Sequence, residues 1–331
     1  MKILLTGGCG FIGTSLVEKL LDNSHTVLNI DKLTNVSNIE RLEYYSKSDS
    51  YKHLKVDICD GQVINDAVFE YKPDIIVHMA AESHVDNSII RPKTFLDTNV
   101  NGTFNLCASS LEYFEKYKPD NFKFIHISTD EVFGSIDFPD KFTENSNYAP
   151  NSPYSASKAS GDSFVRAFKQ TYGLPSVILN CCNNYGPYQF PEKLIPLVIR
   201  KCINNEEIPL YGDGKHVREW IYVEDYCDAI LSIISAAKYD FSYLVGSGVE
   251  CTNESIVHRI CEIMRTKTNS NTDFTKNISF VPDRKGHDRR YSLNSDKFSS
   301  HFKWKTQVSF DEGLNKTIDW YLDHIDSWEK Q

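Results

Sequence analysis

The chain has 331 residues, of which 40% are hydrophobic and 24% charged, proportions that are ordinary for a globular protein. Its net charge of -9 argues against binding nucleic acid, and no apolar run is long enough to cross a membrane. The nine cysteines form no C-x-x-C pair and the ten histidines show no ligand spacing, which indicates free thiols in a reducing compartment, the cytoplasm, and no metal.

The first half of the chain alternates short apolar runs with segments of helical spacing. Strands are expected at Lys2–Thr6, Thr26–Ile30, His53–Ile58, Asp74–Met79, Phe122–Ile127 and Pro175–Cys181. Helices are expected at Phe11–Leu21, Thr94–Tyr117 and Ser152–Tyr172, the last opened by a Ser-Pro cap. This order predicts an α/β fold of the Rossmann type, a doubly wound parallel sheet with helices on both faces.

After Asn183 the alternation lapses, and Pro, Tyr and Gly interrupt the chain. We therefore expect a Rossmann domain at residues 1–182 and a smaller, mixed substrate-binding domain at residues 183–216 and 247–331. Residues 217–246 are expected to return to the first domain, with a helix at Val223–Ala237 and a strand at Ser242–Val245. The polar segment Thr266–Lys276 is expected to be a loop.

The first predicted strand runs into a glycine-rich turn that opens the first predicted helix. Its spacing is G-x-x-G-x-x-G, with the residues Gly7, Gly10, Phe11, Ile12 and Gly13. Glycine lets the backbone approach a pyrophosphate closely, and the helix N-terminus supplies unpaired N–H groups. Asp31 ends the second strand, where a carboxylate binds both ribose hydroxyls and repels a 2′-phosphate. The first domain is therefore predicted to bind NAD and not NADP; the alternative is a glycine turn with no ligand.

Further cofactor contacts are expected where the third and fourth strands end. Asp57 and Ile58 are placed to flank an adenine, although Asp57 alternatively caps a helix. Small residues after the fourth strand permit close approach of the cofactor, and Ser83 faces either cofactor or substrate. The predicted cofactor site also includes Lys32, Thr34, Met79, Ala80, Ala81, Thr98, Tyr154, Lys158 and Asn184.

Tyr154 and Lys158 are four residues apart on a predicted helix and so share one of its faces. A nearby ammonium and the positive charge of a nicotinamide would lower the pKa of the tyrosine. Tyr154 could then take a proton from a hydroxyl while hydride leaves the same carbon. An exposed helix pair is the alternative interpretation.

Thr129, Asp130 and Glu131 follow the strand Phe122–Ile127 at its carboxyl end, where ligands bind in open α/β sheets. Two adjacent, shielded carboxylates cannot both ionise freely, so one serves as an acid and the other as a base. Both can face one substrate only if the strand breaks there, and Gly134 is consistent with a break. The alternative is that one carboxylate caps the next helix. An acid–base pair beside a hydride-transfer site indicates redox chemistry coupled to loss of a group.

These motifs resemble the extended short-chain dehydrogenase/reductase family and, within it, the nucleotide-sugar 4,6-dehydratases, above all those acting on dTDP-glucose. The resemblance runs from Met1 to about Tyr321 and includes the Thr129-Asp130-Glu131 triplet. Related 4-epimerases and decarboxylases share the glycine-rich turn and the tyrosine–lysine pair but typically lack the Asp-Glu pair. Further matching segments are Ala80–Asp86, Asn183–Gln189, Pro191–Pro196, Tyr211–Gly214 and Asp283–Tyr291.

The resemblance implies NAD-dependent dehydration of a nucleotide-diphospho-glucose to its 4-keto-6-deoxy derivative, a step toward deoxysugars such as rhamnose. It implies that Tyr154 takes the 4-hydroxyl proton as C4 gives hydride to NAD, and that Thr129 hydrogen-bonds the 4-oxygen. Glu131 then removes the C5 proton, Asp130 protonates the departing 6-hydroxyl, and hydride returns to C6. The alternatives are a 4-epimerase or decarboxylase on the same scaffold, or a cofactor sensor without catalysis.

The resemblance also implies where the nucleotide sugar binds. The implied substrate residues are Ser83, Thr129, Asn183, Lys193, Leu194, Pro209, Tyr211, Arg218, Asn253, Arg284 and His287. Lysine and arginine suit a diphosphate on an acidic protein, although the segment Asp283–Tyr291 is alternatively a solvated charge run.

The resemblance further implies a homodimer through a four-helix interface, to which each subunit gives the helices Thr94–Tyr117 and Ser152–Tyr172. The chain departs from the family pattern at Phe133, at Asn180, where arginine is usual, and at Tyr243–Gly246. Thymine and uracil differ by one methyl group, and the sequence leaves the base open.

Overall fold

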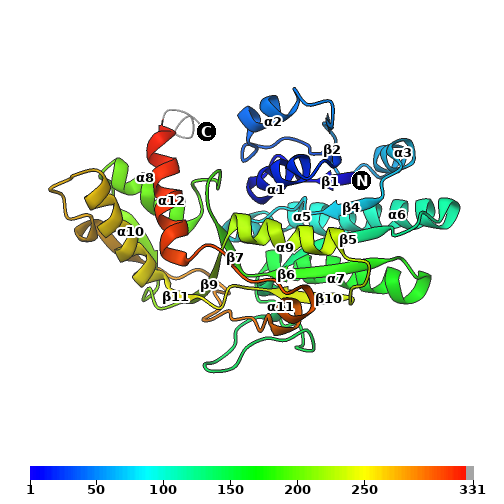
Figure 1. Cartoon of the computed structure of the whole chain (residues 1–331). Helices are drawn as coiled ribbons and strands as arrows, with labels where there is room; N and C mark the ends of the chain where they lie inside the picture. Colours follow the sequence, from blue (N-terminus) through cyan, green and yellow to red (C-terminus); the bar gives the residue numbers. More distant parts are fainter. Residues whose placement is uncertain (326–331) are drawn as a thin grey trace.

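The structure, a computed structural model, describes residues 1–325 and is built around one seven-stranded parallel sheet (Figure 1). Its strands lie in the order β10 (Ser242–Val245), β6 (Ser176–Cys181), β5 (Lys123–Thr129), β4 (Ile75–His78), β1 (Lys2–Thr6), β2 (Thr26–Ile30) and β3 (Tyr51–Leu54). The strand order reverses between β1 and β4, as in a Rossmann fold. The predicted fold class is confirmed.

Helices cover both faces of this sheet, because a parallel sheet buries both. Successive residues of β1 alternate between two cores: Ile3 and Leu5 point into one, and Leu4 points into the other. The first core lies under α1 (Phe11–Asp22) and α9 (Val223–Ser235). The second lies under α3 (Gly61–Tyr71), α6 (Thr103–Tyr117) and α7 (Pro153–Tyr172). Shorter helices are α2 (Ile39–Tyr45), α4 (Val85–Ile90), α5 (Pro92–Leu96) and α11 (Asp296–Phe302).

A smaller region with its own core lies beside the main sheet, where Figure 1 shows its helices gathered on one side. It contains two small sheets and three helices. One sheet has the order β11 (Glu250–Thr252), β9 (Val217–Tyr222), β7 (Asn183–Tyr185), and the other pairs β12 (Ile278–Val281) with β8 (Ile208–Tyr211). The helices are α8 (Leu194–Ile203), α10 (Asn253–Lys267) and α12 (Phe310–Asp323). The predicted domain boundaries stay a prediction, but β9 corrects one detail: only α9 and β10 of residues 217–246 return to the main sheet.

Three predicted elements differ from the structure. The strand expected at His53–Ile58 is β3 (Tyr51–Leu54), and in the turn that follows, the Asp57 carboxylate accepts the Cys59 N–H at 3.0 Å. The loop expected at Thr266–Lys276 is shorter: α10 runs on to Lys267, and a 3₁₀ turn occupies Phe274–Asn277.

The long helix expected at Thr94–Tyr117 is broken. It consists of α5, a π-helical turn at Asp97–Gly102, and α6. The Asn99 carbonyl accepts the Thr103 hydroxyl at 2.7 Å, and α7 passes so close that a side chain at Gly161 would meet that carbonyl at 2.9 Å. Close packing of α7 therefore accompanies the break, and such π-turns often occur at functional sites.

In the part of the chain that the structure describes, no helix combines the length and the apolar character that a bilayer span requires.

Arg290 joins the loop after Gly134 to the smaller region. Its guanidinium makes two contacts with the Glu250 carboxylate, at 2.6 and 3.0 Å, and donates to the carbonyls of Asp137 and Asp140. Only 7% of the Arg290 side chain and 22% of the Glu250 side chain are exposed. Adjacent Arg289 pairs with Asp213, but about half of each of those side chains is exposed.

We therefore expect Arg290→Met to lower the free energy of unfolding by about 3–5 kcal/mol, because it leaves a largely buried carboxylate without its partner. Arg289→Met, the matched control, should cost about 0–1 kcal/mol, since exposed pairs contribute little. Urea denaturation of both variants measures the difference. Equal, small losses would show that the Arg290 pair does not hold the two regions together.

Candidate active site

The glycine-rich turn forms a close-packed cradle between β1 and α1. Gly7 has a φ of +78°, and a side chain at Gly13 would come within 2.1 Å of the Gly7 carbonyl oxygen. The first N–H groups of α1 have no partner within the helix. Asp31, just beyond β2, accepts the Cys9 N–H at 3.0 Å, so the carboxylate is held against the turn. This cradle fits the pyrophosphate and ribose of the predicted dinucleotide.

The end of β4 meets the same turn where the strand order reverses. The Thr6 hydroxyl accepts the N–H groups of Met79 and Ala80, both at 3.2 Å. A side chain at Gly7 would lie 2.8 Å from the Ala80 Cα, so only glycine permits this approach. Ligands bind in such a crevice in open α/β sheets. The structure thus brings together the turn and the Met79–Ala81 segment that the sequence predicted.

The other predicted cofactor residues lie around this crevice, and their roles stay predictions. The Lys32 ammonium lies 3.5 Å from Asp57 and 3.2 Å from Glu82. Thr34 lies in the loop after β2, and Thr98 is buried in the π-helical turn. Ile58 is buried against Gly102. Asn184, on β7, donates to the Cys182 carbonyl, and its own side-chain oxygen is buried without a hydrogen-bond partner.

The backbone breaks directly after β5. Asp130 and Glu131 begin a 3₁₀ turn that ends at Phe133, followed by Gly134 with a φ of +78°. The Thr129 hydroxyl accepts the Glu131 N–H at 3.3 Å and donates to the Asp130 carboxyl at 3.1 Å. The predicted break is present, and the two acids leave the alternation of the strand.

The two carboxyl groups differ in their surroundings. Asp130 is fully buried, and burial together with the Glu131 charge raises its pKa well above the usual range. Burial also raises the pKa of Glu131, but the charges of Arg284, Arg218 and Lys193 oppose that rise. Asp130 therefore holds its proton more firmly than Glu131, which suits the pair to act as one acid and one base.

Tyr154 and Lys158 are both buried on α7, whose N-terminus is closed by a capping box between Ser152 and Ser155. The Lys158 ammonium donates to the Ile127 carbonyl at 2.7 Å. Burial and the Glu131 charge raise the pKa of Tyr154 well above its usual value. The lowered pKa that the sequence predicts for Tyr154 is therefore not produced by the protein's own groups.

Cations of the smaller region face the carboxylates of the main sheet. Lys193, at the start of α8, donates to the Ser83 carbonyl at 2.8 Å and so ties α8 to the end of β4. Arg218, on β9, is buried with its guanidinium 4.2 Å from the centre of the Tyr291 ring and donates to the Asp288 carbonyl. The charges of Lys193, Arg218 and Arg284 all act on Glu131. Two regions of the chain thus form one site.

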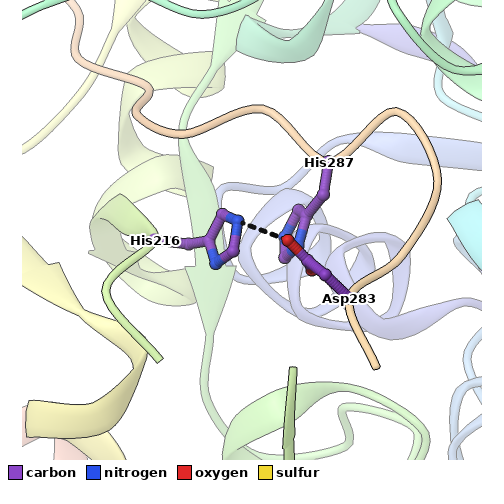
Figure 2. Close-up of side chains that lie close together, drawn as sticks. All are labelled: His216, Asp283 and His287. Carbon is purple, nitrogen blue, oxygen red and sulfur yellow. Dashed lines mark hydrogen bonds and ion pairs between the residues drawn. The ribbon is translucent and has the colours of Figure 1, made fainter. Parts of the chain in front are cut away.

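Figure 2 shows a further cluster, made by His216, Asp283 and His287. The two imidazole rings stack 3.7 Å apart, and each lies against one carboxylate oxygen, at 3.2 Å for His216 and 2.7 Å for His287. Burial lowers the pKa of His287 to about 3, and the nearby charges of Arg284 and Arg218 add to the effect. The Tyr211 ring stands edge-on to His287 at 6.2 Å.

Two imidazoles and a carboxylate form a donor set that zinc accepts. The same arginines oppose a cation there. Asp283 Oδ1 already accepts the Arg284 N–H and contacts His287, while Oδ2 lies at ion-pair distance from His216, so we interpret the cluster as a structural contact between the two histidine segments. The absence of a metal stays a prediction. Sequence reasoning missed His216, because it belongs to a loop far along the chain from the Asp283 segment and shares no motif with it.

The remaining predicted substrate residues lie at the starts or edges of elements of the smaller region, and their roles stay predictions. Asn253 begins α10 and donates its N–H to the His216 carbonyl at 2.9 Å, which links it to the cluster. The others are Asn183 on β7, Leu194 at the start of α8, and Pro209 on β8.

Known proteins resemble the chain over nearly its whole length. Residues 4–317 match the family described as GDP-mannose 4,6 dehydratase. The dTDP-glucose 4,6-dehydratase of Salmonella typhimurium is 45% identical over 97% of this chain and 93% of that protein. A dTDP-glucose 4,6-dehydratase from Streptomyces venezuelae, crystallised with NAD and dTDP bound, superimposes with a TM-score of 0.91 at 39% identity, covering 100% of this chain and 99% of that one.

A UDP-glucose 4-epimerase from Thermotoga maritima, crystallised with UDP-glucose, shares the fold with a TM-score of 0.86 but only 27% identity, covering 98% of this chain and 100% of that one. The likeness to the dehydratases is thus greater in sequence than the likeness to this epimerase. The resemblance inferred from the Asp-Glu pair and its neighbouring motifs is confirmed: the chain belongs to the GDP-mannose 4,6 dehydratase family, and within it to the nucleotide-sugar 4,6-dehydratases of the extended short-chain dehydrogenase/reductase type.

Proposed function

We propose that the chain catalyses NAD-dependent dehydration of a nucleotide-diphospho-glucose to the 4-keto-6-deoxy sugar nucleotide. The observation that carries the proposal is the pair of acids in the turn after β5. Asp130 is buried beside Glu131, and both act electrostatically on Tyr154. Hydride transfer alone has no use for such a pair, whereas removal of water needs an acid and a base.

The crevice between β1 and β4 would hold NAD, as the solved dehydratases hold it. The Gly7–Gly13 turn would face the pyrophosphate, Asp31 the ribose, and Ile58 the adenine. When bound, NAD accepts hydride from C4 of the sugar and returns it to C6. Its positive nicotinamide would also favour the Tyr154 phenolate, against the burial that raises the pKa of this residue.

The protons move through three side chains. The Tyr154 phenolate oxygen takes the proton of the sugar 4-hydroxyl and becomes a neutral hydroxyl, and Thr129 hydrogen-bonds the 4-oxygen. The 4-keto group makes the C5 proton acidic, and a Glu131 carboxylate oxygen removes it. Asp130, whose pKa burial raises well above its usual range, gives its proton to the 6-hydroxyl as water leaves.

The cations of the smaller region would hold the diphosphate. Lys193, Arg218 and Arg284 lie near enough to Glu131 to act on its charge, so a diphosphate bound to them would place the sugar over the acids. The charge of Arg284 acts on both Tyr211 and His287, whose rings lie 6.2 Å apart, and these two side chains would contact the nucleotide.

Product mass after incubation with dTDP-glucose and with UDP-glucose tests the proposed reaction and its base. A dehydratase gives a product lighter by one water. A product of unchanged mass with inverted C4 would identify an epimerase, and the faster of the two substrates identifies the base.

We also propose that the enzyme works in the cytoplasm. All nine cysteines are free, seven of them buried, as expected where thiols stay reduced.

Substitutions should separate the steps of the reaction. Tyr154→Phe should abolish reduction of bound NAD, because no side chain then accepts the 4-hydroxyl proton. Asp130→Asn should still reduce NAD, with NADH absorbance that rises on addition of substrate and decays slowly. Glu131→Gln should allow reduction but block exchange of the C5 proton with solvent. Each loss should cost ~10²–10⁴-fold in overall turnover.

Stopped-flow absorbance and proton exchange measure these steps on the same protein samples. Full dehydratase turnover by Asp130→Asn, or wild-type reduction of NAD by Tyr154→Phe, would contradict the assignment.

Asp31 should determine the choice between NAD and NADP. Asp31→Asn keeps an oxygen that can accept the Cys9 N–H but loses the charge that repels a 2′-phosphate. We expect NAD affinity to fall about tenfold or more, as for other hydrogen bonds to a charged group, and discrimination against NADP to relax. Calorimetric titration of both cofactors measures this. Unchanged affinity for both would remove Asp31 from the ribose site.

We propose a homodimer in which each subunit contributes two helical segments: the broken helix formed by α5 and α6, and α7. These helices expose apolar side chains that usually lie inside proteins: Leu96 is 52% exposed, Phe104 43% and Phe164 38%. The Phe104 and Phe164 rings touch across α6 and α7, with centroids 5.6 Å apart. Large exposed apolar patches mark association sites, which supports the four-helix interface.

Phe164→Asp should therefore shift the protein from dimer to monomer, because it places a charge in the proposed interface. Phe280→Asp is the control, since Phe280 is 58% exposed but lies on β12, in the smaller region. Analytical ultracentrifugation at micromolar concentration measures both. A wild-type monomer, or an unchanged dimer in Phe164→Asp, would count against the interface.

A further inference from the structure

Asp162 is a buried carboxylate one helical turn after Lys158 on α7, and the reaction proposed above gives it no role. Its Oδ2 accepts the hydroxyl groups of Ser128 and Tyr148, both at 2.8 Å, and the Asn180 amide at 3.4 Å. Its Oδ1 lies 3.1 Å from His126 Nε2, an ion-pair distance without hydrogen-bond alignment. Four side chains from three segments of the chain thus converge on one carboxylate.

These contacts stabilise a charge inside the protein. Burial would raise the pKa of Asp162, but His126, the Lys158 charge and the Ser128 hydroxyl together bring it below its usual range. Asn180 is neutral and contributes only its amide group, so the compensating positive charge comes from Lys158 and, when protonated, His126. An ionised carboxylate at this depth requires such a partner.

The Lys158 ammonium is likewise a buried charge that needs a partner of opposite sign. Burial lowers the pKa of this ammonium, and the Asp162 charge opposes that effect, with a smaller contribution from Cys181. His78 and His126 also face Lys158, and burial and the lysine charge lower the pKa of both imidazoles. Among the groups around the Lys158 ammonium, Asp162 is therefore the carboxylate able to keep it charged.

Asp162 is also connected to the strand that carries the two acids. Ser128 belongs to β5, and the Asn180 amide that reaches Asp162 donates at 3.0 Å to the Thr129 carbonyl. The Lys158 ammonium binds the same strand through the Ile127 carbonyl. The Asp162 carboxylate is thus connected to the end of β5 and belongs to the same helix as Tyr154 and Lys158.

We propose that Asp162 is a positioning residue of the proposed reaction: its buried carboxylate is the counter-ion that keeps Lys158 charged, and through Lys158 it sustains Tyr154 as a base. Only the effect of Lys158 on Tyr154 rests on the proposed function. The pairing of Asp162 with Lys158 is proposed for the folded protein alone: the two lie one turn apart on α7 and bind adjacent residues of β5, Ser128 and Ile127.

The kinetic test follows reduction of bound NAD by stopped flow across the pH range, on addition of dTDP-glucose. In Asp162→Asn the Lys158 ammonium should lose its proton at lower pH, so the alkaline limb of the rate profile should move down by about one pH unit or more. Asp162→Glu, which keeps the carboxylate, should return the alkaline limb of the rate profile to its wild-type position. Ser128→Ala should leave it in place, because that variant removes one hydrogen bond and keeps the charge.

A merely structural role for Asp162 predicts a different result, namely a rate reduced by the same factor at every pH. That outcome, or an alkaline limb that stays in place in Asp162→Asn, would overturn the proposal.

A double-mutant cycle tests the pairing without any catalytic readout. Lys158→Met should strongly destabilise the fold because it strands the Asp162 carboxylate, and adding Asp162→Asn should recover stability. We expect the two substitutions to be coupled by about tenfold or more in the unfolding equilibrium constant. Additive effects would refute the pairing. Coupling in a protein without dehydratase activity would refute the proposed function and leave the pairing intact.

Discussion

All seven strands of the main sheet run parallel, so their carboxyl ends meet at one edge, and every part of the site depends on this constraint. The glycine-rich turn follows β1, the Met79–Ala81 segment follows β4, and the two acids follow β5. Residues that are distant in sequence therefore share one crevice, at the point where the strand order reverses. The smaller region closes over this edge, where Lys193 contacts the Ser83 carbonyl.

The proposed chemistry follows from two acidic side chains that are shielded from water and lie near positive charges of the smaller region. Asp130 and Glu131 are adjacent, and burial makes it costly to ionise both. The smaller region supplies lysine and arginine charges that act on Glu131, whereas for Asp130 burial prevails. One residue is left an acid and the other a base, although their side chains differ by only one methylene group. A net charge of -9 over the whole chain makes these local cations the natural site for an anionic diphosphate.

Much of this arrangement was readable from the sequence, because the signals are local. The alternation of elements, the glycine spacing and the break after Thr129 each depend on neighbouring residues. What the sequence could not give depends on tertiary packing. The π-helical turn at Asp97–Gly102 accompanies the close passage of α7 at Gly161. The convergence on Asp162 and the stacking of His216 on His287 join segments that share no motif. The pKa of Tyr154 could not be predicted either, because burial reverses the direction expected from the lysine.

The central claim is that one enzyme-bound cofactor removes hydride from C4 and returns it to C6 while water leaves. It is tested most directly with nucleotide-glucose deuterated at C4, by mass and NMR analysis of the product. The account predicts a 4-keto-6-deoxy product that carries the deuterium at C6 and a solvent-derived proton at C5. A product that keeps its 6-hydroxyl and carries the deuterium back at C4 would contradict the account and identify an epimerase.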